Sequence, residues 1–362
     1  MNLYKIESPY DRVLQEDLEW IAGQTLPYEE MRGAYIMVTG ATGLVGSMAV
    51  KALACCNRIL DLGMKILPLI RSEEKAARVF GELLEREDIC PVVGDITAPV
   101  KTEYPVDYIV HGASVTASKV MVTQPVETIR TALVGTEHML QLAAEKQVRS
   151  MVYISSMEAF GVTDPSLPCV REENLGYIDV MNVRSCYSEG KRMCEVMCAS
   201  YASEYQVPVK VARLAQTFGA GVSKEEGRVF AQFARSAMTG TDIVLHTRGE
   251  STGNYCYTAD AVAGILTILL KGQTGNVYTV ANPSTTIKIR DMAKMVAEQL
   301  AEGRIQVVFD IPEDAMTYGY APDVAMHLNS DKLQALGWKP KYDLPEMYDR
   351  LVKSFREQGF EA

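Results

Sequence analysis

The fold is decided by the stretch Tyr35-Ile36-Met37-Val38-Thr39-Gly40-Ala41-Thr42-Gly43-Leu44-Val45-Gly46. Its apolar run is typical of a buried strand, and a glycine-rich turn follows the strand. After the turn, apolar residues recur at helical spacing as far as Leu53. Gly40 would allow the tight turn, Gly43 would let backbone amides approach a pyrophosphate, and Gly46 would let the helix pack closely on the strand. The helix N-terminus would add free N–H groups and a partial positive charge. The stretch therefore predicts a dinucleotide site, although its G-x-x-G-x-x-G spacing is one residue wider than G-x-G-x-x-G and such turns also serve as plain connections.

Composition and charge exclude several classes of protein. The chain has 362 residues, of which 48% are hydrophobic, enough for one large domain or two interlocked ones. Its net charge of −10 argues against nucleic acid or an anionic membrane as a partner, because phosphate groups are bound by basic patches. No apolar run reaches the roughly 18 residues of a membrane span, and the acidic N-terminal stretch does not resemble a signal peptide. Eight cysteines without a C-x-x-C pair and four scattered histidines predict reduced thiols, no metal site and a cytoplasmic protein.

Strand and helix patterns alternate along the first 215 residues. The strands expected after the glycine turn are 65–70, 90–96, 107–114, 151–156 and 209–214, with a long amphipathic helix at 125–147 and a further helix from Tyr187 to about Ala202. The alternation predicts an α/β fold with a doubly wound parallel (Rossmann) sheet, whose ligands bind beyond the C-terminal ends of the strands. We expect a helical extension at 1–33, the dinucleotide-binding domain at 34–215, and at 216–362 a smaller substrate-binding cap that can interleave with it.

The ends of the second and third strands bear on the choice of cofactor. An acidic residue after the second strand would bind the adenosine ribose and favour NAD. Arg71 stands there instead and suits either a 2′-phosphate or stacking on the adenine ring, which favours NADP, although Glu73 and Glu74 lie close by. Asp95 is expected either near the adenine ring or as the cap of a turn before Thr97.

The fourth strand ends in small residues, as a cofactor passing over it would require. His111, at this end, is more typical of a packed strand-end residue than of a catalyst. The candidate cofactor-binding residues are Gly40, Thr42, Gly43, Leu44, Val45, Gly46, Arg71, Asp95, Ile96, His111, Gly112, Ala113, Ser114, Tyr187 and Lys191.

Tyr187 and Lys191 stand four residues apart and would share one face of a helix. A neighbouring ammonium favours the phenolate, so we expect the pKa of Tyr187 to fall below its usual value of about 10. The Y-x-x-x-K pattern alone is weak, because an exposed pair at this spacing is common. Its place after the strand that ends in Ser155-Ser156 strengthens it, since a serine hydroxyl there can bind a substrate oxygen while the tyrosine moves a proton.

Taken together, these motifs resemble the extended short-chain dehydrogenase/reductase family, and within it the nucleotide-sugar epimerase/dehydratase branch. The stretches that carry the resemblance are Gly40-Ala-Thr-Gly43-Leu-Val-Gly46, Asp95-Ile96, Val134-Gly135-Thr136, Ser155-Ser-Met-Glu-Ala-Phe-Gly161, Tyr187-x-x-x-Lys191 and Asn329 to Pro340. The segment from Arg184 to Arg192 is most similar to UDP-glucuronate decarboxylases, and next to dTDP-glucose 4,6-dehydratases. The resemblance implies a bound nicotinamide that oxidises a sugar hydroxyl to a ketone, after which the sugar decarboxylates, loses water or epimerises.

The resemblance also implies roles for single residues. Tyr187 would be the base that starts the oxidation, and Lys191 would hold the nicotinamide ribose and tune the tyrosine. Ser156 would share the substrate oxygen. Glu158 would assist the second step, and the alternative is an ordinary solvated loop acid. The substrate-binding candidates are Ser156, Gln216 and Arg248.

Several positions depart from the family's pattern. Met157 stands where the dehydratases carry an aspartate, which disfavours loss of water. Ala132 and Gln216 replace asparagines, and Gly253 stands where an arginine is expected to grip the diphosphate. A missing guanidinium removes a bidentate, charge-assisted contact, for which Arg248 could substitute from another direction.

Three readings of function follow. The first is an NAD(P)-dependent epimerase, dehydratase or decarboxylase that acts on a nucleotide-activated sugar. Within this reading the sequence supports epimerisation and decarboxylation equally. The second is an NADP-dependent carbonyl reductase, which Arg71 favours. The third is a cofactor-sensing protein without turnover, which the complete set of Ser156, Tyr187 and Lys191 opposes.

The helix at 125–147 and the helix from Tyr187 carry more apolar surface than one buried face requires. Two such helices from each of two subunits would bury the excess in a four-helix contact, as the resemblance implies, so we expect a homodimer. The alternative is that residues 1–33 fold back and cover this surface within one chain.

Overall fold

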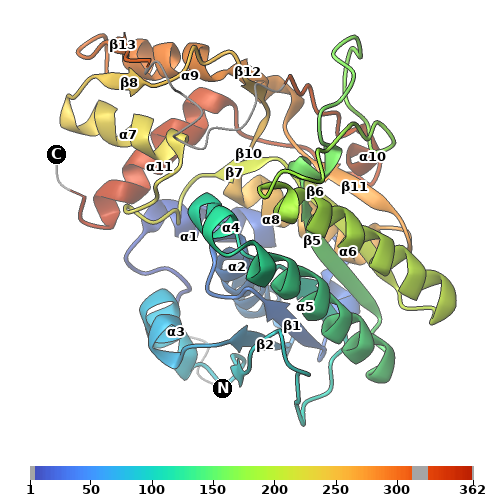
Figure 1. The fold of residues 1–362 in the computed structure, drawn as a ribbon. Helices are drawn as coiled ribbons and strands as arrows, with labels where there is room; N and C mark the ends of the chain where they lie inside the picture. The colour runs from blue at the N-terminus through green and yellow to red at the C-terminus, as the bar shows by residue number, and fades with distance from the viewer. Residues whose placement is uncertain (1–4, 312–324, 361–362) are drawn as a thin grey trace.

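The structure is a computed structural model that describes residues 5–311 and 325–360 (Figure 1). Its centre is a parallel sheet of seven strands in the order β11-β6-β5-β4-β1-β2-β3. The strands are β1 (Tyr35–Thr39), β2 (Lys65–Ile70), β3 (Val92–Val93), β4 (Tyr108–His111), β5 (Ser150–Ser156), β6 (Val209–Leu214) and β11 (Val277–Val280). The predicted α/β fold with a doubly wound parallel sheet is confirmed.

Helices cover both faces of the sheet, because successive side chains of each strand point to opposite sides. In β1, Ile36 and Val38 join the core beneath α2 (Leu44–Leu60) and α8 (Thr258–Lys271), whereas Met37 joins the core beneath α5 (Pro125–Glu145) and α6 (Ser185–Glu204). Strands buried on both faces read as continuous apolar runs, and this explains why the pattern was visible in the sequence.

Several element boundaries differ from the expected ones, and the fourth strand ends at His111 rather than at 114. The third strand is only two residues long, since Pro91 has no N–H to donate and Gly94 starts the turn after a last bond from its N–H to the Ile70 carbonyl. The long helix ends at Glu145 rather than at 147. The helix that carries Tyr187 begins at Ser185 and continues to Glu204.

The chain after residue 216 contributes to two parts of the molecule. β11, α8 and α10 (Asp331–Gln334) belong to the main sheet and its covering layer, and most of the other elements form the smaller part in the upper half of Figure 1. Its strands pair as β7 (Gln216–Phe218) with β10 (Tyr255–Tyr257), β9 (Thr252–Gly253) with β12 (Ile287–Lys288), and β8 (Ile243–Leu245) with β13 (Val307–Phe309). Its helices are α7 (Val229–Thr239), α9 (Ile289–Met295) and α11 (Leu344–Glu357), with a π-helical turn at Val296–Leu300.

The N-terminal segment packs against the α2 side of the sheet. Its helix α1 (Arg12–Ala22), capped by Asp11, contacts α2, α8 and α11. The buried Asp17 of α1 accepts hydrogen bonds from the hydroxyl of Tyr257 at 2.6 Å and from Arg350 of α11 at 2.7 Å. The described part of the N-terminal segment therefore lies on the face opposite α5 and α6, and the alternative in which it would cover those helices is wrong.

The remaining helices are short. They are α3 (Glu73–Phe80), α4 (Ser118–Thr123) and the 3-10 turns Tyr28–Met31, Gly81–Glu85, Met157–Phe160 and Pro283–Thr285. Within residues 5–311 and 325–360, no helix is long and apolar enough to cross a membrane.

Candidate active site

The glycine turn between β1 and α2 has the geometry that a dinucleotide site needs. Gly40 has φ +66°, and a methyl group on it would lie 2.7 Å from the backbone of Gly112. A methyl group on Gly46 would overlap the Gly40 carbonyl. Both positions therefore exclude larger residues, and the first N–H groups of α2 face outward at the C-terminal edge of the sheet. The turn, with the half-buried Thr42, fits a pyrophosphate.

Arg71 and Asp95 lie together beyond the ends of β2 and β3. Their charged groups are 3.9 Å apart and both side chains are exposed, 74% and 47% respectively. The Asp95 carboxylate also accepts hydrogen bonds from the N–H and hydroxyl of Thr97, which together with Arg71 hold its pKa below its usual range. Asp95 thus caps the turn, and its carboxylate competes for Arg71. Ile96 is buried against Gly135 of α5.

His111 is a packed residue at the end of β4. Its ring is 1% exposed and lies within hydrogen-bond distance of Thr39 and Thr136, at 2.7 and 3.2 Å. Burial and the nearby charge of Lys191 lower its pKa to about 3, so the imidazole is neutral. The half-buried Gly112, Ala113 and Ser114 continue the strand end toward the glycine turn.

Tyr187 and Lys191 occupy the face of α6 that looks toward β5. The Lys191 ammonium donates a hydrogen bond to the Ile154 carbonyl at 2.8 Å. The same nitrogen lies 4.9 Å from the ring centre of Tyr153 and 5.7 Å from the ring centre of Tyr187. Because the lysine is 3% exposed, burial lowers its pKa to about 8.

The pKa of Tyr187 differs from the sequence-based expectation. Burial of the phenol and the negative charge of Glu158 raise it to about 12, against the lowering effect of a hydrogen bond with Ser156 and of the charges of Arg184 and Arg228. The expected fall below 10 is wrong for the protein by itself. Burial is the largest cause, and the Lys191 ammonium is directed at the Ile154 carbonyl rather than at the phenol.

Glu158 is held by an arginine that the sequence-based site did not include. Arg184 Nη2 lies 2.9 Å from Glu158 Oε1, and its guanidinium carbon lies 5.7 Å from the ring centre of Tyr187. The other guanidinium nitrogen, Nη1, is buried and has no hydrogen-bond partner in the described structure. Its position three residues before Tyr187, on the same side of a helix start, was the available signal. Ser156 caps the following turn by accepting the N–H of Glu158 at 3.2 Å.

The other two substrate-binding candidates, Gln216 and Arg248, lie in the smaller part of the molecule. Gln216 is exposed at the start of β7, and Arg248 is exposed in the loop after β8. Gly253 is buried in β9, and a methyl group on it would meet no atom within 4 Å. The backbone at the position expected to hold an arginine therefore has room for the first carbon of a side chain.

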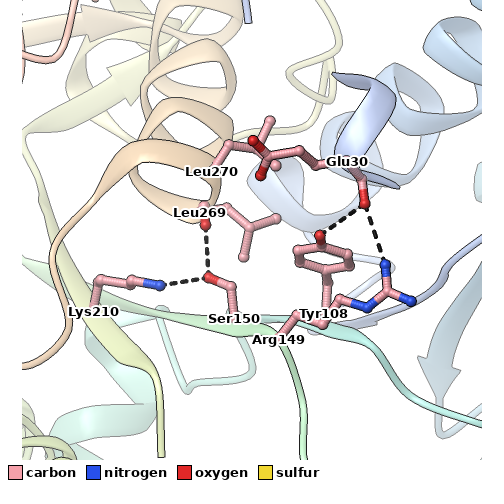
Figure 2. A pocket seen from close by; sticks show the side chains of 7 residues that line it. All are labelled: Glu30, Tyr108, Arg149, Ser150, Lys210, Leu269 and Leu270. Carbon is pink, nitrogen blue, oxygen red and sulfur yellow. Dashed lines mark hydrogen bonds between the residues drawn. The ribbon is translucent and has the colours of Figure 1, made fainter. Parts of the chain in front are cut away.

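A cavity of about 360 Å³ lies at the opposite edge of the sheet, beside the first residues of β4 and β5 (Figure 2). There the buried Lys210 donates a hydrogen bond to Ser150 at 2.7 Å, and Ser150 donates one to the Leu269 carbonyl at 2.6 Å. Leu269 is in the last turn of α8, where carbonyl groups carry partial negative charge. Burial lowers the pKa of Lys210 to about 8. The contacts indicate that Lys210, through Ser150, offsets the partial negative charge at the C-terminal end of α8.

Comparison with known proteins identifies the family of this chain. The sequence profile of the NAD dependent epimerase/dehydratase family matches residues 36–281. Among curated proteins, UDP-glucuronic acid decarboxylase 6 of Arabidopsis thaliana is 29% identical over 327 residues, which cover 89% of this chain and 88% of the relative. UDP-glucuronic acid decarboxylase 3 of the same plant is 30% identical over 264 residues, 72% of this chain and 73% of the relative.

Solved structures share the fold. UDP-glucose 4-epimerase of Thermotoga maritima, determined with UDP-glucose, has a TM-score of 0.75 at 20% identity and covers 90% of this chain and 100% of its own. dTDP-glucose 4,6-dehydratase of Bacillus anthracis, determined with NAD, has a TM-score of 0.72 at 19% identity, over 90% and 97% of the two chains. With a family profile that spans more than half of its length and a relative at 30% identity, the chain belongs to the NAD dependent epimerase/dehydratase family of enzymes.

Proposed function

We propose that the protein uses NAD or NADP to act on a nucleotide-activated sugar through a transient keto intermediate. One observation carries the proposal. The hydroxyls of Ser156 and Tyr187, the Lys191 ammonium and the Glu158 carboxylate gather at the C-terminal end of β5, at the edge of the sheet that carries the glycine turn. This set can remove a proton from a sugar hydroxyl as the hydroxyl is oxidised to a ketone. It can then transfer a second proton to or from the keto sugar.

The cofactor would lie along the C-terminal edge of the sheet. The glycine turn and the first turn of α2 would hold the pyrophosphate, and Lys191 would hold the nicotinamide ribose. When bound, an oxidised nicotinamide supplies the electron acceptor for the sugar and a positive charge near Tyr187. A positive charge favours the phenolate, and it would offset the burial that raises the pKa of Tyr187.

Each protein group has a definite task in this scheme. Tyr187 takes the proton of the reacting hydroxyl, while Ser156 donates a hydrogen bond to the same oxygen. Glu158, held by Arg184, serves the second step as proton acceptor or donor. The unpaired Nη1 of Arg184 can bind a carboxylate or phosphate oxygen of the substrate.

A UDP-linked uronic acid is the first candidate substrate. The names of the curated relatives support it, and so does the unpaired guanidinium nitrogen beside Tyr187. The apolar, buried Met157 cannot act as an acid and disfavours loss of water. Gly253 leaves the diphosphate without the expected arginine, so epimerisation of a related sugar stands level with decarboxylation.

Chromatographic separation of the products, coupled to mass spectrometry, tests the proposal. The protein is incubated with either UDP-glucuronate or UDP-glucose, in the presence of NAD and, in parallel, of NADP. Loss of carbon dioxide indicates decarboxylation, and a new isomer of unchanged mass indicates epimerisation. Steady consumption of reduced cofactor with simple carbonyl compounds, and no change in either sugar nucleotide, would support the carbonyl reductase instead. No product in any of these reactions would refute the proposal.

The choice between NAD and NADP depends on Arg71. Its exposed guanidinium can pair with a 2′-phosphate. The Asp95 carboxylate, 3.9 Å from the guanidinium, would compete with the phosphate for this pairing. We favour NADP, and we expect Arg71→Ala to lower the affinity for NADP more than that for NAD. An unchanged ratio of the two dissociation constants would make Arg71 an ordinary surface residue.

We further propose a cytoplasmic homodimer. All eight cysteines are free thiols, as expected in a reducing compartment. The apolar side chains exposed on α5 and α6 are Val126 at 72%, Ile129 at 40%, Met193 at 50% and Val196 at 56%. A second copy would bury them in a two-fold contact.

A further inference from the structure

Four buried polar side chains form a continuous hydrogen-bonded chain between the glycine turn and the catalytic helix. His111 lies 2.7 Å from the Thr39 hydroxyl through Nδ1 and 3.2 Å from the Thr136 hydroxyl through Nε2. Thr136 Oγ1 donates to Cys194 Sγ at 3.4 Å, and Cys194 donates to the Ala132 carbonyl at 3.2 Å. The four side chains belong to β1, β4, α5 and α6.

We infer that His111, Thr136 and Cys194 are positioning residues, which set the place of the Tyr187–Lys191 face of α6 relative to the dinucleotide turn. Thr39 immediately precedes Gly40, the first residue of that turn. Cys194 follows Lys191 by three residues and Tyr187 by seven, so the three lie on one face of α6. The chain of bonds thus ends on the two elements whose separation decides where a nicotinamide would meet the tyrosine.

The direction of every bond follows from the number of lone pairs. Thr39 Oγ1 accepts the N–H groups of Gly112 and Ala113, at 3.2 and 3.1 Å. Its own hydrogen is therefore donated to His111 Nδ1, which leaves the imidazole proton on Nε2, facing Thr136. Thr136 and Cys194 each accept one hydrogen and pass on another. One tautomer of one neutral histidine satisfies all the groups.

Burial explains why these hydrogen bonds fix the positions of the elements rather than add stability. Thr39, His111, Thr136 and Cys194 are at most 1% exposed, and buried polar groups add little net stability over apolar ones of the same shape. Hydrogen bonds, unlike apolar contacts, are directional, and a fully satisfied network specifies a single arrangement. Neutrality of His111 also matters, because a charged imidazole would stand near the Lys191 ammonium.

The test compares three variants of the full chain. Thr136→Val keeps the shape but removes the link between His111 and Cys194, and Thr136→Ser restores the hydroxyl. Thr267→Val is the matched control, because Thr267 is also a buried helical threonine, but its hydroxyl bonds only the Ala263 carbonyl in α8. All measurements are made well below the unfolding temperature of each variant.

Two readouts need no substrate. Nitrogen NMR of the four histidines should show His111 as the single Nε2–H tautomer in all four proteins, because Thr39 donates to Nδ1 in each of them, and the Nε2–H signal should shift only in Thr136→Val, where its acceptor is lost. The fluorescence anisotropy of bound NADH or NADPH, whichever the wild type binds more tightly, should fall in Thr136→Val alone, with cofactor affinity changed less than about threefold. Equal anisotropy in all four proteins would overturn the inference, as would the opposite tautomer in the wild type.

The turnover readout rests on the proposed function. We expect kcat of Thr136→Val to fall roughly ten- to hundredfold with little change in KM, because a displacement of about 1 Å can cost this much. Thr136→Ser should recover most of it. If Thr136→Val does not fold, Cys194→Ala, which removes the α6 end of the chain, takes its place in every comparison. A wild type without turnover would refute the proposed function, whereas the anisotropy and the tautomer would still decide this inference.

Discussion

Arg184 Nη2 and Glu158 Oε1 form an ion pair of 2.9 Å directly beside the phenol of Tyr187. The two residues come from different elements, the start of α6 and the turn after β5. Their charges act on Tyr187 in opposite directions, since Glu158 raises its pKa and Arg184 lowers it. The pair is partly exposed, so its main effect is to orient the carboxylate and to tune the tyrosine.

Tyr187→Phe should abolish turnover and leave cofactor affinity within about threefold, since only the proton-transfer group is lost. Product formation and cofactor binding are measured on the same preparation. Tyr205→Phe, at the exposed C-terminal end of α6, is the control and should behave as the wild type. Turnover that survives within about tenfold, roughly 1.4 kcal/mol of barrier, would remove Tyr187 from the mechanism.

Glu158→Gln should move the pH dependence of the oxidation step to lower pH. A base must lose its proton to act, so the rate of oxidation rises with pH up to the pKa of Tyr187. The glutamine removes a negative charge that raises this pKa, and the pKa therefore falls. The rate of cofactor reduction is followed in single turnovers from pH 6 to 10. Glu189→Gln, whose carboxylate pairs with Arg192 instead, should leave the profile unchanged. Identical shifts in both variants would contradict the role of Glu158.

Gly253→Arg should strengthen the binding of UDP by about tenfold, or roughly 1.4 kcal/mol, because a guanidinium–phosphate bond is charge-assisted. A Cβ at this position would meet no atom within 4 Å, and the φ of Gly253 lies outside the range that requires glycine. Calorimetric titration with UDP measures the change. Gly253→Met, which adds a long uncharged side chain, is the control. If Arg and Met have the same effect, the position does not face the diphosphate.

Val196→Glu should convert a dimer into a monomer, because it places a charge on the exposed apolar face of α6. Met197 is less suitable, since it is partly buried against the core of its own chain. Light scattering coupled to size exclusion should give twice the chain mass of 40.0 kDa for the wild type and for Val244→Glu, an exposed control on β8. A wild-type particle of 40.0 kDa at micromolar concentration would rule out the dimer.

Asp260→Asn should make stability less dependent on pH. Burial raises the pKa of Asp260 to about 7 and that of Asp17 to about 6, from ordinary values near 3.8. The folded state then holds these protons more tightly than the unfolded state. Their contribution to the free energy of unfolding is therefore most favourable below about pH 4 and falls as pH rises to about 7.

Asparagine stays neutral and keeps an oxygen for the N–H groups of Lys341 and Tyr342. Urea unfolding at pH 5 and pH 8 should thus show a gain for Asp260→Asn of a few kcal/mol at pH 8 relative to pH 5, since one pKa unit is worth about 1.4 kcal/mol. Asp349→Asn, on the exposed side of α11, serves as the control. A pH dependence equal to that of the wild type would show that Asp260 is not the titrating group.

Much of this protein could be read from its sequence, because the relevant signals are local. The strand at 35–39, the glycine turn and the Tyr187–Lys191 spacing each depend on residues that are neighbours along the chain. A buried parallel strand needs an unbroken apolar run, and Gly40 and Gly46 are required where backbones come too close for a side chain. These constraints leave their mark on a few adjacent letters, and they were sufficient for the fold class.

Only the tertiary structure decided the arrangements that join distant segments. β11 comes more than sixty residues after β6 and still completes the main sheet. Helix α1 packs on the α2 side of the sheet rather than on the α5–α6 side. The pKa of Tyr187 rises because burial and Glu158 outweigh the nearby cations, which no spacing along the chain could reveal. The Arg184–Glu158 pair and the bonds of His111 likewise depend on directions of side chains in space. Hydrogen bonds and desolvation act over a few ångströms, whatever the separation in sequence, and for that reason they are fixed only when the chain has folded.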